Sequence, residues 1–203
     1  MDDTMIGKFI TELPMDDPSE MRVSSKPIHY IKELGSGVHG AVYLAVIESK
    51  EYAIKVWKWQ SDIDLAERLR IYTSPFSHEC RAFARLQSRG ENGTWAVKCH
   101  GWIKLSDEQY RSLPRRYGFP LIHWAIVKEY LPNPIQLSDI PEIVRKKEIA
   151  RQALMYNPHN CDILPRNFRG SFIVDLGNTI TYPYPLYWSN WGFENAYETL
   201  ISG

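Results

Sequence analysis

Three glycines set between two runs of β-forming residues constrain this chain more than any other feature. Gly35, Gly37 and Gly40 lie within residues 31–47, where apolar and polar residues alternate on both sides of the glycines. Such alternation is typical of two strands joined by a turn. Because glycine has no Cβ, this turn can bring its backbone close to a phosphate-bearing ligand. A third strand is expected next, at Tyr52-Ala-Ile-Lys55.

Residues suited to phosphate and metal binding follow this segment in an informative order. Lys55 is suited to phosphate, and Glu79 is the acid expected to hold that lysine in place. Asp162 and Asn167 have the Asp-x-x-x-x-Asn spacing of a catalytic loop, and Asp175-Leu-Gly177 has the form of a metal-binding turn. Four separate motifs in this order point to one shared pocket.

The order and spacing of these motifs resemble the protein-kinase fold. The resemblance implies an α+β architecture, with an antiparallel N-lobe sheet and a helix, followed by a truncated C-lobe. It also implies the residues that bind substrate or nucleotide: Gly35, Gly37, Gly40, Lys55, Asn167 and Asp175. The expected parts are an acidic arm over 1–27, an N-lobe over 28–131 and a C-lobe with an aromatic-rich tail over 132–203. Little sequence follows Gly177, which disfavours an ordinary protein kinase.

Hydrophobic periodicity predicts the main elements of these lobes. Strands are expected within 28–57, 95–105 and 123–130, and helices over 76–87 and 140–156. Short strand-like pieces are expected around Ile163 and Ile173.

Two narrower resemblances bear on function. Glu51-Tyr-Ala-Ile-Lys55, Val97-Lys-Cys-His-Gly101 and Ile126-Val-Lys-Glu129 are cues shared with the kinase-like domain of a fungal kinetochore-subunit family. Asp16-Asp17-Pro-Ser-Glu20 matches the Asp-Asp-x-x-Glu motif of fungal arginine-containing cyclodipeptide synthases, which the chain also resembles. That second resemblance implies an enzyme of secondary metabolism that condenses arginyl-tRNA with a second aminoacyl-tRNA into cyclo(Arg-Xaa), a diketopiperazine.

The chemistry of that condensation fits acidic and basic residues of the chain. The ester bonds of aminoacyl-tRNA are already activated, so this reading requires no ATP or other cofactor. A carboxylate can act as general base or pair with a guanidinium group. The expected catalytic residues are Asp16, Asp17, Glu20, Asp162 and Glu79. The residues expected to meet tRNA phosphates are Arg145, Lys146, Lys147 and Arg151.

Composition narrows the classes of function that remain for this chain. The formal net charge is zero, so overall charge does not favour nucleic acid or membrane. The three cysteines are far apart, which indicates neither a disulfide framework nor a zinc site, and no metal centre is expected. Apolar runs are too short to span a membrane. We expect a cytoplasmic protein without a membrane or protein partner.

Plainer interpretations stay open beside these. A kinase-like phosphotransferase would need ATP and Mg²⁺ in the same pocket, and a non-catalytic kinetochore module would need neither. Lys55 and Glu79 would also serve as a structural ion pair, and Asn167 and Asp175 as turn caps. Acidic residues are common at helix starts, and a basic helix face is usually solvated.

Overall fold

The structure is a computed structural model that describes residues 26–58, 75–114, 120–153, 155–156, 163–181 and 191–202. The described residues divide into two compact units. The first unit contains 26–58, 99–114 and 120–130, and the second contains 75–98 and the described residues from 131 onward. The lobe boundaries expected from the sequence stay a prediction.

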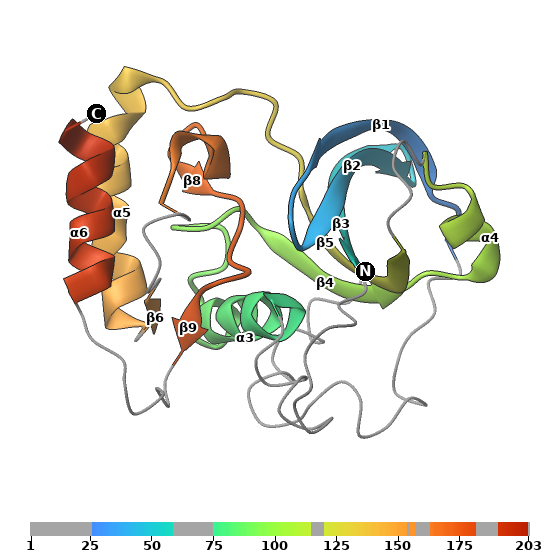
Figure 1. Cartoon of the computed structure of the whole chain (residues 1–203), viewed down its shortest axis with the longest axis horizontal. Helices are drawn as coiled ribbons and strands as arrows, with labels where there is room; N and C mark the ends of the chain where they lie inside the picture. The colour runs from blue at the N-terminus through green and yellow to red at the C-terminus, as the bar shows by residue number, and fades with distance from the viewer. Residues whose placement is uncertain are drawn as a thin grey trace. The chain divides into compact units, whose positions relative to one another are not determined.

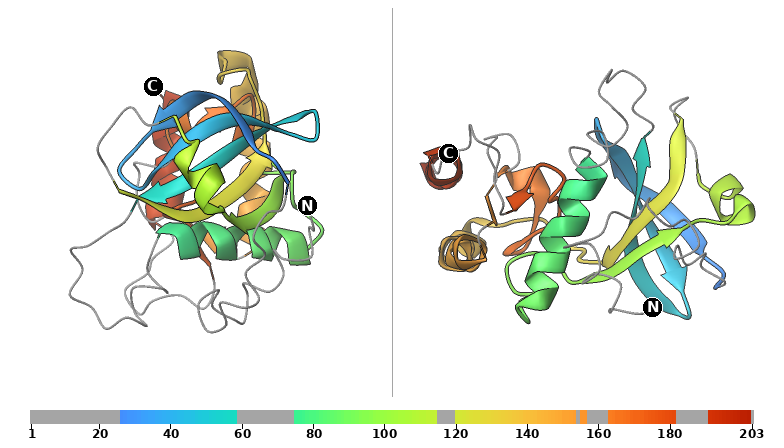
Figure 2. Two further views of the ribbon diagram at one scale, coloured as in Figure 1. Left: turned by 90° about the vertical axis from the view of Figure 1, so that its right-hand side faces the viewer. Right: turned by 90° about the horizontal axis from the view of Figure 1, so that it is seen from below.

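A five-stranded antiparallel sheet forms the first unit (Figure 1). The strand order is β1-β2-β3-β5-β4, so β5 lies between β3 and β4. The strands are β1 His29–Ser36, β2 Gly40–Ile47, β3 Lys50–Lys58, β4 Cys99–Lys104 and β5 Leu121–Glu129. Figure 2 shows how strongly these strands twist.

One face of this sheet carries the core of the first unit. Because side chains alternate along a strand, Tyr43 of β2, Ile54 of β3 and Val127 of β5 share that face. The short helix α4 (Asp107–Arg111) follows β4, and Ser106 is its N-cap. Ser106 Oγ accepts a hydrogen bond from the Gln109 backbone N–H at 3.2 Å, and Gln109 Oε1 accepts one from the Ser106 N–H at 2.8 Å. This reciprocal cap explains why so short a helix forms there.

The second unit combines helices with short strand pairs. Its helices are α3 Pro75–Ser88, η2 Leu137–Asp139, α5 Ile140–Gln152, η3 Pro165–Asn167 and α6 Trp191–Ser202. Its strands are β6 Met155–Tyr156, β7 Phe168–Arg169, β8 Phe172–Ile173 and β9 Ile180–Thr181, and they pair as β6–β9 and β7–β8. Helices α5 and α6 lie side by side (Figure 1), and the Lys147 ammonium is 5.5 Å from the centre of the Tyr197 ring.

A buried hydrogen bond joins α6 to the segment before β4. The indole N–H of Trp95 donates to the Tyr197 hydroxyl at 2.9 Å, and both side chains are almost completely buried. The backbone beside Trp95 also pairs with β8, since the Val97 N–H donates to Ile173 O at 2.9 Å. Residues 95–97 therefore contact both α6 and β8 within the second unit.

The predicted fold class is confirmed. The described residues form a mixed α+β structure with an antiparallel five-stranded sheet, which is compatible with a protein-kinase-like fold. The predictions for β1 to β3, for α3 and for β5 are correct within a few residues.

Two element boundaries and one expected strand differ from the predictions. The strand expected from residue 95 begins at Cys99, because residues 95–97 pair with Ile173 of the second unit instead. The helix expected to reach residue 156 ends at Gln152, and Met155–Tyr156 pairs with β9. No strand is present around Ile163 in the described residues, where η3 follows closely.

Candidate functional site

The glycine-rich turn connects β1 to β2 in the first unit. The Gly37 N–H donates to Gly40 O at 2.9 Å, and the Lys58 N–H donates to His39 O at 2.9 Å. The Lys58 ammonium donates to Gly37 O at 2.5 Å, so the end of β3 holds the turn from the other side.

The fold requires glycine at only one of the three glycine positions of this turn. A Cβ on Gly40 would lie 2.5 Å from Val56 O, so the close approach of β2 to β3 requires glycine there. A Cβ on Gly35 or Gly37 would meet nothing within 4 Å. The fold therefore explains Gly40, whereas the open space beside Gly35 and Gly37 leaves room for a ligand.

Lys55 lies on the sheet face opposite the core cluster. Strand register places it beside Val42 on β2 and Ile126 on β5. Its side chain is 3% exposed, and its ammonium is 4.2 Å from the centre of the Trp57 ring. The ring is two residues along the same strand and offers its π-face to the cation.

Lys128 is a second buried lysine on that face, and the sequence reasoning missed it. Ala53 pairs with Lys128 and Lys55 with Ile126, so the two lysines are diagonal neighbours on adjacent strands. Lys128 is also 3% exposed. The signal in the sequence was a charged residue at an inward position of an otherwise apolar strand.

Glu79, Asn167 and Asp175 belong to the second unit. Glu79 lies on α3 and is completely buried. The Val174 N–H donates to the backbone Asn167 O at 2.8 Å, which brings the backbone of the predicted catalytic loop beside the predicted metal-binding turn. Asp175 Oδ1 accepts a hydrogen bond from the Gly177 N–H at 2.9 Å, as a turn-capping carboxylate does. Lys55 belongs to the first unit, so its pairing with Glu79 stays a prediction.

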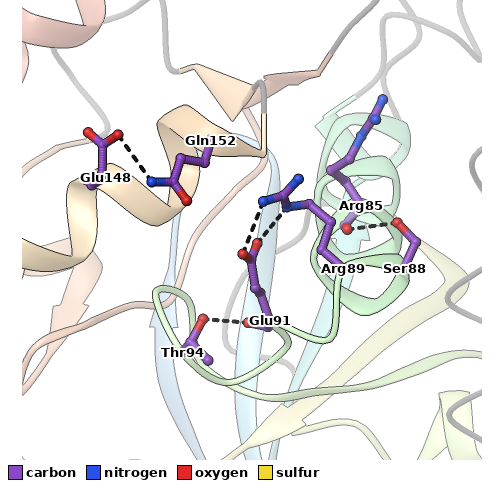
Figure 3. A network of polar contacts seen from close by, with 7 residues as sticks. All are labelled: Arg85, Ser88, Arg89, Glu91, Thr94, Glu148 and Gln152. Carbon is purple, nitrogen blue, oxygen red and sulfur yellow. Dashed lines mark hydrogen bonds and ion pairs between the residues drawn. The ribbon is translucent and has the colours of Figure 1, made fainter.

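The helix that carries Glu79 ends in a well-defined cap. Gly90 has φ +71°, its N–H donates to Gln87 O, and the Glu91 N–H donates to Leu86 O. This is a Schellman arrangement, which stops the helix and turns the chain. Figure 3 shows the polar contacts that follow, where the Arg89 guanidinium holds the Glu91 carboxylate at 2.8 and 3.2 Å. They direct the chain toward residues 95–97 and the pairing with β8.

The four basic residues of α5 do not share one solvent face. Arg145 holds Glu142 with hydrogen bonds of 2.7 and 2.6 Å, and Arg151 lies 3.7 Å from Glu148. Lys147 lies over the Tyr197 ring. Lys146 is 6% exposed, and its ammonium donates to Ser171 Oγ at 2.9 Å. Contact of this set with tRNA phosphates stays a prediction.

Several predicted site residues lie outside the described residues: Asp16, Asp17, Glu20 and Asp162. Within the described part of the chain, no group of three or more histidine, cysteine or acidic residues is arranged to hold a metal ion. None of the helices described there is long and apolar enough to cross a membrane.

Comparison with known proteins identifies a family for this chain. No curated protein matches it significantly. Residues 14–180 match the family described as kinetochore Sim4 complex subunit FTA2, and this stretch contains the glycine-rich turn, Lys55, Glu79, Asn167 and Asp175. The match covers most of the chain and agrees with the kinetochore-subunit resemblance of its motifs, and the chain therefore belongs to the FTA2 family of kinetochore Sim4 complex subunits.

Proposed function

We propose that this chain is a non-catalytic interaction subunit of a kinetochore complex, built on a kinase-like fold. The observation that carries the proposal is the family match over residues 14–180. The family is defined by a subunit of a complex, so the proposal implies protein partners. It also implies nuclear localisation, in place of the cytoplasmic localisation and absence of protein partners expected from the sequence.

Contacts of the candidate site support this proposal. Asp175 caps its own turn, and Gly40 is required where β2 approaches β3. Two of the basic side chains of α5 are held by neighbouring carboxylates. Residues that a catalytic reading would assign to ligands thus also have roles in maintaining the fold.

The test is the location and company of the whole protein in its native cells. The full chain, tagged at its C-terminus, is expected to concentrate at centromeres and to co-purify with kinetochore subunits identified by quantitative mass spectrometry. A second culture with the tag alone is the control. Diffuse cytoplasmic fluorescence together with no enrichment of kinetochore subunits would overturn the proposal.

A second candidate is arginine-containing cyclodipeptide synthesis. The observation behind it is the Asp16-Asp17-Pro-Ser-Glu20 motif, which lies within the matched residues 14–180. Purified protein with pre-charged tRNAs would then release cyclo(Arg-Xaa) without ATP. Asp17→Asn would abolish product while leaving the melting temperature unchanged, since the amide removes charge and nearly keeps shape.

Assays on the same purified proteins distinguish the two candidate functions. If the wild-type protein and the variants Asp16→Asn, Asp17→Asn and Glu20→Gln release equal amounts of product, these three residues do not belong to the catalytic site. An absolute need for ATP would favour a phosphotransferase. The absence of any product from protein that co-purifies with kinetochore subunits would leave the first proposal standing alone.

A further inference from the structure

The β7–β8 hairpin of the second unit presents a serine at its turn. Phe168–Arg169 pairs with Phe172–Ile173, so Gly170 and Ser171 form the connection. Gly170 has φ +52°, and a Cβ built on it would meet nothing within 4 Å. Ser171 is partly exposed. The turn is therefore open to solvent on the side of Gly170.

A buried cation lies directly beneath this turn. Lys146 of α5 donates to Ser171 Oγ at 2.9 Å, and its ammonium is 3.3 Å from the centre of the Phe172 ring. Among the described residues, Ser171 Oγ is the only side-chain acceptor within hydrogen-bond distance of this ammonium. An ammonium group has three N–H donors, so this one has capacity to spare.

The nearest carboxylate compensates Lys146 only in part. Glu142 lies 3.9 Å from the ammonium, beyond hydrogen-bond distance, and both its oxygens accept hydrogen bonds from Arg145. Burial lowers the pKa of Lys146 below its ordinary value, although Glu142 acts in the opposite direction. A positive charge held out of water with a neutral hydroxyl as its closest acceptor favours an added anion.

We propose that Ser171 is a phosphorylation site and that Lys146 holds the phosphate. A protein serine kinase would supply the phosphoryl group from ATP. The Ser171 oxygen forms the new bond to the γ-phosphorus, the bond to the bridging oxygen breaks, ADP leaves, and the hydroxyl proton passes to the base of that kinase. Arg166 in η3 and Arg169 in β7 add positive charge just upstream of Ser171 in the sequence.

The consequence is a regulated link between the hairpin and α5. A phosphoserine carries about −1.5 to −2 charges at neutral pH and can form one to three charge-assisted hydrogen bonds. The hydrogen bond from the Lys146 ammonium to a neutral hydroxyl would become an ion pair, which would fasten α5 to the hairpin. The backbone of that hairpin also contacts Asn133, since the Gly170 N–H donates to Asn133 O at 3.0 Å. The proposal is independent of the function proposed above.

The test places phosphoserine at position 171 of the full chain by genetic encoding. Phosphoserine at Ser49, an exposed residue of the β2–β3 turn in the first unit, is the control. Lys146→Met, which keeps most of the side-chain length, provides the second background. The phosphate at 171 is expected to raise the melting temperature by about 2–4 °C in the wild-type background and not in Lys146→Met. The phosphate at 49 should raise it in neither.

A second readout reports the charge directly. In ³¹P NMR titrations, the second pKa of the phosphate at 171 should lie below that at 49, because an adjacent ammonium favours the dianion. The difference should disappear in Lys146→Met. Equal titration at both positions, or equal melting shifts in both Lys146 backgrounds, would overturn the assignment. So would native protein from dividing cells whose Ser171 peptide carries no phosphate by mass spectrometry.

Discussion

At the scale of single residues, the three glycines of the glycine-rich turn differ in how strongly the fold requires them. Gly40→Ala should lower the free energy of unfolding by about 1–3 kcal/mol, because its Cβ would overlap Val56 O and push β2 from β3. Gly35→Ala and Gly37→Ala should be nearly neutral, since open space surrounds both positions. Urea unfolding followed by tryptophan fluorescence measures all three. Equal losses at the three positions would contradict this distinction.

Tyr30 gives a second prediction at this scale. Its hydroxyl is buried and has no hydrogen-bond partner among the described residues. Its ring packs edge-on against the Tyr43 ring, with the two ring centres 5.7 Å apart. Tyr30→Phe should therefore raise the free energy of unfolding by about 1 kcal/mol, since it removes an unsatisfied polar group and keeps the ring. The matched control is Tyr110→Phe, which should destabilise because that hydroxyl donates to Leu121 O at 2.6 Å.

The pH dependence of the same variant has a defined sign. Burial, and to a smaller extent the charge of Tyr43, raises the pKa of Tyr30 above its ordinary value near 10. The folded protein therefore keeps a proton that the unfolded chain loses, and stability should fall as the pH rises above about 10. Tyr30→Phe should show a shallower alkaline loss in unfolding experiments. An identical slope in both proteins would count against the buried hydroxyl.

Sequence reasoning located single residues well only where a motif constrained them. The positions of Lys55 on β3 and Glu79 on α3 were predicted correctly. The burial of Lys146 was missed, because a run of three basic residues reads as a solvated face until the partner of that helix is known. Lys128 was missed for the same reason, since its surroundings depend on the register of β5 with β3.

At the scale of elements, the β2–β3 hairpin carries avoidable strain. Glu48 and Ser49 both have positive φ, the conformation that two-residue hairpin turns require and that glycine adopts at low cost. Ser49→Gly should raise the free energy of unfolding by about 0.5–1 kcal/mol, measured by urea unfolding. Ser36→Gly, the same change in the extended backbone of β1, should lower it. A loss at both positions would show that the turn is not strained.

The elements themselves were largely predictable, and their ends were not. Alternation predicted the strands of the first unit because each has one face in the core. The helix predicted for α5 was too long, because residues 155–156 continue the apolar pattern. In the structure these two residues pair with β9, which lies far from them in the sequence. The strand expected from residue 95 was too long because residues 95–97 pair with β8. Long-range pairing of this kind leaves no local signal.

At the scale of the whole molecule, fold and family follow from the sequence, and activity does not. The motif order predicted a kinase-like α+β fold and resemblance to a kinetochore family, and both agree with the structure and the family match. The same residues would serve a catalytic pocket or a stable scaffold, because a buried lysine and a turn-capping aspartate are compatible with either. Only an experiment on the intact protein separates these uses.

Lys55 provides that experiment. Its side chain is 3% exposed and lies over Trp57, so it contributes almost no surface to a protein partner. If the chain acts as an interaction subunit, Lys55→Met should co-purify with kinetochore subunits within twofold of the wild-type yield. Lys50→Met, at the exposed start of the same strand, controls for loss of a positive charge. Melting temperatures of both variants are measured first, so that a folding defect is not read as lost binding. A folded Lys55→Met that no longer assembles would contradict this expectation and would show that assembly depends on the interior around Lys55.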